Sequence, residues 1–279
     1  MTEPTRSPWA GRRVLLTGCT GFLGSAVARE LFAAGAEVVG LIHDRSGAEV
    51  FGAGAGARAH LIRGRADNVF RLHSAMAVHE VAAVFHLAAT DPFAEDRGTH
   101  AVLEAAKLYS RRVPVVAVRP LQQLSLLGRA EPLGGLSVAR FGEVFGPGDR
   151  KVFRTVPATA LGLHADDPPA LVPEGPPTDF VFVRDAARAC LRVAEDVALR
   201  GPGDYPFRSG WLLSARRMSL AVRDVFNGAA PALPEVGPIA NPLGWSPAVP
   251  FAEAVSETLD WYGAFLRAGP GGVPVRAAA

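Results

Sequence analysis

Cysteine, lysine and tyrosine are scarce in this chain of 279 residues, which contains two cysteines, two lysines and three tyrosines. Cys19 and Cys190 cannot form the disulfide framework of a small secreted domain, and we expect a structural role for Cys19. No apolar run approaches the roughly 18 residues of a membrane-spanning helix. The first ten residues also lack the apolar core of a signal peptide. We therefore predict a cytoplasmic protein.

Charge of one sign is also missing, since 29 basic residues face 27 acidic ones and the formal net charge is +2. Without a block of lysine and arginine, the sequence argues against a nucleic acid or a membrane as partner. The seven histidines are scattered, with no His-x-x-x-His pair and no cluster of cysteine and histidine. We expect no metal site, because zinc sites usually draw their ligands from such groupings.

Apolar runs of strand length alternate with helical patterns in the first half of the chain, which is typical of a parallel sheet covered by helices. Residues 14–16 form a continuous apolar run, as expected of a strand that is buried on both faces. The other predicted strands cover 37–42, 59–63, 81–89, 113–118 and 136–141. The sequence therefore predicts an α/β fold with a Rossmann doubly wound parallel sheet.

The second half is more broken, with five prolines between residues 168 and 177. We predict a short strand at 180–183, with Asp185 as the N-cap of the following helix. An amphipathic helix is predicted after Pro250, and its inner face consists of Phe251, Val255, Leu259, Tyr262 and Leu266. These elements predict a small C-terminal substrate lobe.

The strongest local signal is the segment TGCTGFLG at residues 17–24, which follows the first strand and opens a helix. Gly18 permits a tight turn, Gly21 lets the backbone approach a pyrophosphate, and Gly24 lets the helix pack closely. The N-terminus of the helix then faces the phosphates. The cofactor-binding residues predicted in this loop are Gly18, Thr20, Gly21, Phe22, Leu23 and Gly24.

This glycine spacing resembles that of short-chain dehydrogenases, and later segments resemble the extended branch of that family, the NAD-dependent epimerases and dehydratases. The similar segments are VFHLAA (84–89), RFGEVFGPGD (140–149), TDFVFVRD (178–185) and LGWSP (243–247) with the Trp-Tyr pair at 261–262. The whole run is most similar to CDP-glucose 4,6-dehydratase-like members, over residues 12–267 with one large gap. The resemblance implies an NAD or NADP cofactor and a nucleotide-sugar substrate.

The resemblance divides the chain into three regions. Residues 11–150 are expected to form the NAD(P)-binding Rossmann domain. Residues 151–267 are expected to be a mixed region, a substrate lobe from which 179–198 return to the Rossmann sheet. The tail, 268–279, is rich in glycine, proline and alanine and is predicted to be disordered.

Beside the cofactor, the resemblance places Leu87, Ala88 and Ala89 after the fourth strand. Ile42 stands where an acidic residue usually ends the second strand and binds the adenosine ribose. Asp44 could serve NAD, whereas Arg45, followed by a serine, could hold the 2′-phosphate of NADP.

Both cofactors therefore stay open. After the third strand, Arg65 replaces a common adenine-contacting aspartate, and Asp67 follows two residues later.

The Tyr-x-x-x-Lys pair of the family is missing from the chain. In that family the tyrosine acts as general acid and base, and the lysine orients the nicotinamide ribose and lowers the tyrosine pKa. Four residues after the three tyrosines stand Val113, Ser209 and Leu266. The helix that should carry the pair is absent between 119 and 135. Because this helix usually forms half of the dimer interface, the homodimer that the family implies is also in question.

Arg119, Gln122 and Ser125 follow the fifth strand, at the carboxyl edge where open α/β sheets bind ligands. They are the catalytic candidates, and the alternative is that they are ordinary loop residues. In the substrate lobe, Glu143 replaces a frequent asparagine and Thr178 a frequent arginine. The loss of that arginine weakens the case for a substrate that carries a pyrophosphate.

Three other residues favour structural interpretations. The segment GLSVA at 135–139 is similar to a nucleophile elbow, but Ser137 lies within a predicted strand and no helix follows at once. We expect His86 to be a structural part of its strand and Tyr109 to pack as a helix aromatic.

The sequence leaves three functional hypotheses. The first is an enzyme of the epimerase/dehydratase type that acts on a nucleotide sugar or a related secondary metabolite without the usual Tyr/Lys pair. The second is a catalytically dead, cofactor-binding regulator or scaffold. The third is a non-redox enzyme, a cyclase or dehydratase, that reuses the pocket. The residues favour an enzyme without deciding the matter.

Overall fold

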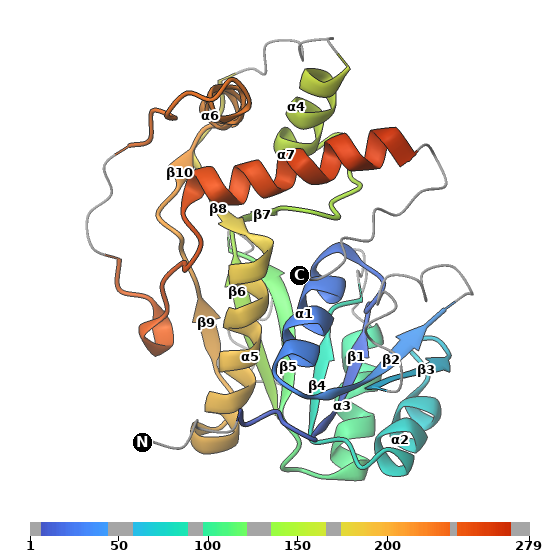
Figure 1. Cartoon of the computed structure of the whole chain (residues 1–279). Helices are drawn as coiled ribbons and strands as arrows, with labels where there is room; N and C mark the ends of the chain where they lie inside the picture. Colours follow the sequence, from blue (N-terminus) through green and yellow to red (C-terminus); the bar gives the residue numbers. More distant parts are fainter. Residues whose placement is uncertain are drawn as a thin grey trace, which may run out of the picture. The chain divides into compact units, whose positions relative to one another are not determined.

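The computed structural model describes residues 7–43, 58–88, 97–121, 135–165, 174–234 and 239–268. The chain divides into two units (Figure 1). Unit 1 comprises Met1–Arg140 and Ala187–Tyr205, and unit 2 comprises Phe141–Ala186 and Pro206–Ala279.

Unit 1 is built on a seven-stranded sheet with the strand order β3-β2-β1-β4-β5-β6-β9. The strands are β1 (Arg13–Thr17), β2 (Glu37–Ile42), β3 (Ala59–Arg63), β4 (Ala83–His86), β5 (Val115–Pro120), β6 (Leu136–Phe141) and β9 (Asp204–Pro206). The pairs from β3 across to β5 are parallel. The predicted Rossmann-type α/β fold is therefore confirmed.

In the described part of unit 1, the helices are α1 (Phe22–Ala33), α2 (Val69–Val78), α3 (Arg97–Tyr109) and most of α5 (Val183–Arg200). The helices α2 and α3 share one hydrophobic core with Leu15 of β1 and Val84 of β4. Leu72 and Met76 of α2 are fully buried there, and each such side chain contributes about 1.5–3 kcal/mol of transfer free energy.

The helices α1 and α5 are joined by an ion pair of 3.1 Å between Glu30 and Arg188. Trp9, which precedes β1, donates from its indole nitrogen to Glu195 of α5 at 2.6 Å. The ring of Trp9 also lies 6.0 Å from that of Phe85 in β4. Because Phe85 and Val84 are adjacent in a strand, their side chains point to opposite faces of the sheet. Helices therefore cover both faces, which the continuous apolar strands require.

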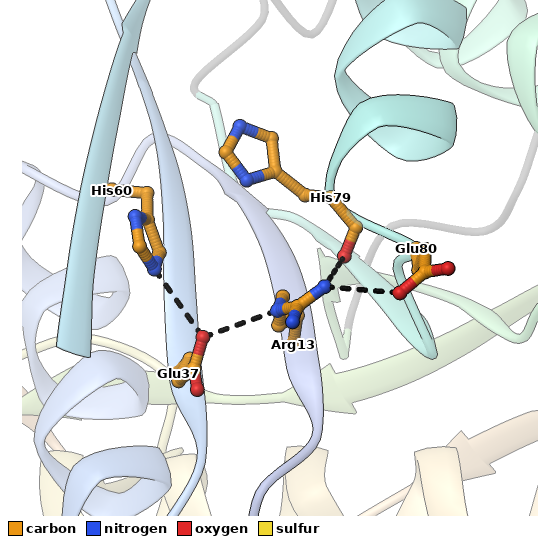
Figure 2. A network of polar contacts seen from close by, with 5 residues as sticks. All are labelled: Arg13, Glu37, His60, His79 and Glu80. Atoms are coloured by element: carbon orange, nitrogen blue, oxygen red, sulfur yellow. Dashed lines mark hydrogen bonds and ion pairs between the residues drawn. The ribbon is translucent and has the colours of Figure 1, made fainter.

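A polar network ties together the amino ends of the first three strands (Figure 2). Arg13, the first residue of β1, donates to Glu37 of β2 at 3.2 Å, to Glu80 at 3.2 Å and to the carbonyl of His79 at 3.1 Å. His60 of β3 pairs with the same Glu37 carboxylate at 3.3 Å. This network lies at the edge of the sheet opposite to the glycine loop.

Unit 2 contains a three-stranded sheet in the order β10-β8-β7, with β8 parallel to β7 and antiparallel to β10. Its elements are β7 (Glu143–Phe145), α4 (Thr155–His164), β8 (Thr178–Phe182), β10 (Leu212–Leu213), α6 (Ala215–Phe226), the short 3-10 helix η3 (Pro242–Gly244) and α7 (Phe251–Ala268). An aromatic cluster joins the sheet to α7, with ring centroids 5.1–6.4 Å apart, and comprises Phe145, Phe182, Trp211 and Phe251.

The observed elements refine several of the sequence predictions. Strands 37–42, 59–63 and 136–141 have the predicted bounds, whereas β4 is shorter than 81–89 and β5 lies two residues later than 113–118. The helix α2 had not been predicted, although Asn68 accepts a hydrogen bond from Arg71 N at 2.9 Å as its N-cap. Within the segment 179–198, β8 pairs in the three-stranded sheet and Ala187 onward belongs to unit 1.

Two predictions in the second half are wrong. Asp185 does not cap a helix, because β8 leads directly into α5 at Val183 and Asp185 lies inside the first turn. Its buried carboxylate instead accepts from the backbone nitrogens of Ala248 and Val249 at 3.1 and 3.3 Å. Leu266 is 43% exposed near the end of α7 and does not belong to the inner face. The predicted disordered tail, 268–279, begins at Ala268, which is the last residue of α7, and the rest of it, 269–279, lies outside the described residues.

Candidate nucleotide site

The order of the strands identifies the ligand-binding edge of unit 1. The chain proceeds from β1 outward through β2 to β3, and then returns to place β4 on the other side of β1. In open α/β sheets, ligands bind outside the carboxyl ends of the strands at this point of reversal. The glycine loop follows β1 and Leu87 follows β4, so both lie at this point.

Glycine is required at position 18 by two independent features. The backbone of Gly18 has φ +69°, and a Cβ atom there would lie 2.5 Å from the nitrogen of Ala88 and 2.6 Å from the carbonyl of Leu87. Leu87 N also donates to the carbonyl of Thr17 at 3.1 Å. The loop after β1 therefore packs directly against the chain after β4, at Leu87 and Ala88.

Gly24 brings the helix equally close to the loop. A Cβ atom at this position would lie 2.0 Å from the carbonyl oxygen of Gly18, closer than two non-bonded heavy atoms can approach. Gly24 is buried in the first turn of α1. The predicted packing role of Gly24 is confirmed, and its partner is the turn at Gly18.

The first turn of α1 has the character of an anion site. Gly21 is the N-cap residue with an extended backbone, no side chain caps the helix there, and the first turn carries no acidic residue. Thr20 and Gly21 are exposed, while Phe22 and Leu23 are half-buried. The first N–H groups of a helix have no partner within it, and their positive end attracts phosphate. The loop thus fits the pyrophosphate of a dinucleotide.

A buried hydroxyl closes the junction between β1 and β4. Thr17 Oγ1 lies 2.8 Å from Nδ1 of His86 and accepts from Ala88 N at 3.4 Å. Both Thr17 and His86 are buried, so His86 has the structural role predicted for it. Cys19, two residues after Thr17, is also buried, and burial raises the pKa of its thiol to about 11. This thiol is therefore structural, as expected.

At the adenosine end, the predicted residue Asp67 is engaged by Arg65. The guanidinium of Arg65 donates to both carboxylate oxygens of Asp67, at 2.8–3.2 Å. These hydrogen bonds lower the pKa of Asp67 and raise that of Arg65. Gly64 N donates to the carbonyl of Ile42 at 3.0 Å, which keeps the ends of β2 and β3 together.

The predicted cofactor residues Asp44, Arg45 and Ala89 lie outside the described residues.

Of the three catalytic candidates, the structure describes Arg119 alone. It belongs to β5 itself, near the carboxyl end, and not to a loop after the strand. Its guanidinium donates to Thr99 Oγ1 of α3 at 3.0 Å and to the carbonyl of Val118 at 3.0 Å. Gln122 and Ser125 fall within 122–134, outside the described residues. The grouping of the three residues therefore stays a prediction.

In unit 2, a cluster of charged side chains holds the turn after β7. Arg154 donates to Asp149 Oδ2 at 2.6 Å and to the carbonyl of Val144 at 2.6 Å, and its Nε lies 3.6 Å from Glu143 Oε1. Burial raises the pKa of both carboxyl groups, and Arg154 opposes this shift. The hydroxyl of Tyr262 in α7 donates to the carbonyl of Asp149.

The strand motif 178–185 has a similar internal role. Asp179 is 5% exposed and accepts from Ser209 N at 2.9 Å, Ser209 Oγ at 3.1 Å and Gly210 N at 3.0 Å. Burial raises the pKa of this carboxyl group, and the hydrogen bonds oppose the shift. Thr178 stands at the start of β8 and is half-buried. The conspicuous acidic residue of this motif therefore fixes the backbone before β10.

The structural interpretations of two further residues are confirmed. Ser137 lies in β6, is fully buried and accepts from Gly203 N at 3.2 Å, so it is not a nucleophile. Tyr109 packs at the end of α3 against the core of unit 1. Over the described parts of the chain, no group of three or more metal-ligating side chains occurs. No described helix is long and apolar enough to cross a membrane.

Sequence reasoning did not single out Thr17, Thr99 or Arg154 as residues that shape the site. Thr17 had an available signal, since it stands directly before Gly18 at the end of a strand. The contacts of Thr99 with Arg119 and of Arg154 with Glu143 join residues that are 20 and 11 positions apart. Residues so far apart form no helix or strand periodicity, so the sequence gives no signal for either contact.

Comparison with known proteins agrees with this geometry. Residues 14–112 match the model of the NAD dependent epimerase/dehydratase family. The matched segment contains the glycine loop and the chain after β4, and it ends before β5. No curated protein matches the chain in sequence.

Solved structures of the same fold include three enzymes that are similar over nearly their full length. The Bordetella bronchiseptica enzyme WbmF, in complex with NAD+ and UDP, is 21% identical, with a TM-score of 0.72 and coverage of 94% of this chain and 95% of that one. UDP-glucose 4-epimerase from Thermotoga maritima, with UDP-glucose, is 18% identical (TM-score 0.68, coverage 91% and 99%). The dTDP-glucose 4,6-dehydratase from Bacillus anthracis, with NAD, is 16% identical (TM-score 0.69, coverage 90% and 96%).

Proposed function

We propose that this chain, which matches the model of the NAD dependent epimerase/dehydratase family over residues 14–112, binds a nicotinamide dinucleotide in unit 1. The bound form is NAD or NADP, and the site is the carboxyl edge between β1 and β4. The residues assigned to the cofactor in the described chain are Gly18, Thr20, Gly21, Phe22, Leu23, Gly24, Asp67, Leu87 and Ala88.

The observation that carries the proposal is the close approach of two backbone segments at Gly18. A side chain at this residue would overlap the backbone of Leu87 and Ala88. In the same loop, Thr20 and Gly21 are exposed directly before α1 begins. A pyrophosphate needs such a surface, because it is bound by backbone N–H groups that no side chain covers.

The proposed activity is a divergent form of epimerase, dehydratase or reductase chemistry. A bound dinucleotide would supply a hydride acceptor or donor. The chain would supply the pyrophosphate cradle and the ordered junction of Thr17 with His86. It does not supply a Tyr-x-x-x-Lys pair. The connection from β5 to β6 has only 15 residues, 121 to 135. Arg119, near the end of β5, donates a hydrogen bond to Thr99 of α3.

The proposed substrate is a nucleotide sugar or a related secondary metabolite. Its support is the similarity of fold to enzymes solved with UDP, UDP-glucose and NAD. A CDP-glucose 4,6-dehydratase-like subtype rests on the resemblance of the sequence over residues 12–267 alone. Glu143 and Thr178 argue for a departure from that substrate, because they stand where the family often has an asparagine and an arginine.

A second candidate function is a cofactor-binding regulator or scaffold without turnover. The absent Tyr/Lys pair favours it, because general acid–base groups typically contribute about 10²–10⁴-fold to such steps. A non-redox cyclase or dehydratase that reuses the pocket is the third candidate. Gln122 and Ser125 remain catalytic candidates under the first and third of these functions.

Titration calorimetry of the purified chain with NAD+ and NADP+ tests the proposal, together with mass spectrometry of co-purified nucleotide. We expect micromolar binding of at least one dinucleotide. No binding at roughly millimolar nucleotide would refute the proposed site. With UDP-glucose or dTDP-glucose as substrate, we expect no turnover above background. Measurable epimerisation or dehydration by the purified protein would contradict that expectation.

A further inference from the structure

We propose that Glu143 is a ligand-binding residue of unit 2 and that its carboxylate recognises an ammonium group on the substrate. The inference rests on the proposed function and deepens it, because it narrows a nucleotide-sugar substrate to one that carries an amino group. All the residues that carry the argument belong to unit 2.

Glu143 lies at the start of an otherwise apolar face of the three-stranded sheet. It is paired with Phe180 in the parallel ladder. Because residues i and i+2 of a strand point to the same face, Glu143 shares its face with Phe145, which is paired with Phe182. These three phenylalanines are each at most 1% exposed. The packing of this face therefore does not call for a carboxylate at position 143.

The backbone that presents Glu143 is fixed by close packing. A Cβ atom on the preceding residue, Gly142, would lie 1.9 Å from the carbonyl oxygen of Asp179, so β7 begins in direct contact with β8. Asp179 is itself held by the backbone nitrogens of Ser209 and Gly210, at 2.9 and 3.0 Å. The side chain of Glu143 thus projects from a rigid position, as a residue that selects a ligand requires.

Arg154 is the cation beside Glu143, but its short contacts go to other groups. It donates to Asp149 Oδ2 and to the carbonyl of Val144, both at 2.6 Å. Its Nε lies 3.6 Å from Glu143 Oε1, which is too far for a hydrogen bond. Glu143 Oε1 is buried and accepts no hydrogen bond from the described part of the chain. A buried acceptor without a donor is destabilising, and its presence in a folded protein calls for a functional explanation.

The charges of this cluster do not balance. Glu143 and Asp149 are two carboxylates beside the single guanidinium of Arg154, and Arg150 and Lys151 of the same turn are exposed, where solvent screens their charges. The side chain of Asp149 is 2% exposed, whereas that of Glu143 is 24% exposed and can be reached by a ligand. Burial raises the Glu143 pKa, Arg154 lowers it, and Asp149 raises it. A cation supplied by a ligand would balance the cluster at Glu143.

An ammonium group is the ligand chemistry that fits this carboxylate. An ionised carboxylate only accepts hydrogen bonds, so the ligand must donate, and a charged donor forms a stronger hydrogen bond than a hydroxyl group. A phosphate would be repelled. A metal ion fits less well, because the described ranges hold no group of three or more metal-ligating side chains. Among nucleotide sugars, Glu143 therefore favours those in which an amino group replaces a hydroxyl group of the sugar.

Calorimetry on the full chain tests the ligand. The probes are UDP-glucosamine and dTDP-4-amino-4,6-dideoxyglucose, each compared with the counterpart that has a hydroxyl group in place of the amine. We expect at least one amine to bind about tenfold more tightly than its counterpart. In Glu143→Gln this preference should vanish, and the hydroxyl sugars should bind within about twofold of their affinity for the unaltered chain. Glu253→Gln is the matched control, since Glu253 is an exposed acid of α7 in the same unit, and it should leave every affinity unchanged.

Thermal unfolding without ligand separates a ligand-binding carboxylate from a structural one. Glu143→Gln should leave Tm unchanged or raise it, because the substitution removes a partly buried charge that accepts no hydrogen bond at Oε1. Asp149→Asn is the comparison, since this carboxylate is hydrogen-bonded to Arg154, and its Tm should fall by about 5 °C or more. A Tm for Glu143→Gln that falls as far as that of Asp149→Asn would show that Glu143 is structural and would overturn the proposal.

The binding outcomes separate the two levels of the argument. If the hydroxyl sugars bind as tightly as both amines or more tightly, the inference is wrong while the proposed nucleotide-sugar substrate stands. If an amine is preferred but Glu143→Gln keeps the preference, the assignment of Glu143 is wrong. If none of the four nucleotide sugars binds, the proposed substrate fails, and the inference with it.

Discussion

The glycine loop of unit 1 and the charged turn of unit 2 are both held in a fixed conformation, but by different physical means. At Gly18, two backbone segments approach so closely that no side chain fits between them. At Asp149, a buried carboxylate is held by Arg154, and the hydroxyl of Tyr262 bonds to the adjacent carbonyl. The first arrangement requires that residue 18 has no side chain, and the second requires that the buried Asp149 carboxylate is paired with Arg154.

The difference indicates which of the two arrangements tolerates substitution. A backbone cradle binds phosphate with little help from side chains, so it persists when the residues around it are replaced. A turn held by buried charges can take different ligand-facing groups only if the charges stay paired. The chain accordingly has a glycine loop similar to that of the epimerase/dehydratase family, whereas it lacks Tyr-x-x-x-Lys and carries Glu143 beside Arg154.

The largest effect is expected when the charged turn is broken. Arg154→Met leaves Asp149, whose side chain is 2% exposed, without its partner, and should reduce the free energy of unfolding by about 3–5 kcal/mol. Removal of Arg154 raises the Asp149 pKa further, so part of the loss should be recovered as the pH falls. Denaturant unfolding at two pH values measures both effects.

Arg150→Met is the matched control, since Arg150 is exposed in the same turn and should change stability by less than about 0.5 kcal/mol. A stable Arg154→Met variant would show that the turn does not depend on its charges. The affinity for dinucleotide should change less than about twofold, because the proposed site lies in unit 1.

The next effect concerns the glycine loop. Gly18→Ala introduces a side chain at φ +69° and overlaps the backbone of Ala88, so it should destabilise the protein by about 2–4 kcal/mol. Dinucleotide affinity should fall by roughly 100-fold or more. Gly11→Ala isolates the effect of the backbone angle, since Gly11 has φ +73° and a Cβ atom there meets nothing within 4 Å. Equal effects of the two substitutions on affinity would contradict the packing argument.

A smaller effect is expected at the hydroxyl between β1 and β4. Thr17→Val keeps the shape of the side chain but removes the partner of His86 Nδ1 and the acceptor for Ala88 N. The free energy of unfolding should fall by about 1–2 kcal/mol, because buried polar groups lose a hydrogen bond. Thr17→Ser restores the hydroxyl and should recover most of the loss. Thermal unfolding of the three proteins tests this.

The smallest effect is a pH dependence at the opposite edge of the sheet. Burial, His60 and Arg13 lower the pKa of His79 below its usual 6.5. The unfolded chain therefore binds a proton more readily at this residue, and stability that is present above pH 6.5 should be lost as the pH falls below it. His79→Gln should flatten the acid limb of a stability–pH curve without altering nucleotide affinity. An unchanged acid limb would exclude His79 as its source.

Much of unit 1 could be predicted from sequence because its constraints are local. A strand that is buried on both faces has a continuous run of apolar residues. A turn residue that has φ above zero and touches a second backbone segment must be glycine. The helix α2 was missed although Asn68 marks its start, because its ten residues form a short and weakly marked pattern.

The errors in unit 2 arise from contacts between distant residues. Asp185 has the residue type and position of an N-cap, but β8 runs into α5 without a loop, and the carboxylate serves backbone groups 63 and 64 residues away. The bond from Tyr262 to the carbonyl of Asp149 spans 113 residues. Such partners follow from the folded arrangement and leave no periodic signal.

The most direct test of the central claim is amide hydrogen exchange of the full chain with and without saturating NADP+ and NAD+. The account predicts slower exchange on nucleotide binding at residues 18–24 and at 87–88, with the amino-edge network around Arg13 unchanged. Binding that leaves both segments unprotected, or that protects unit 2 alone, would contradict the assignment of the nucleotide to the junction of β1 and β4.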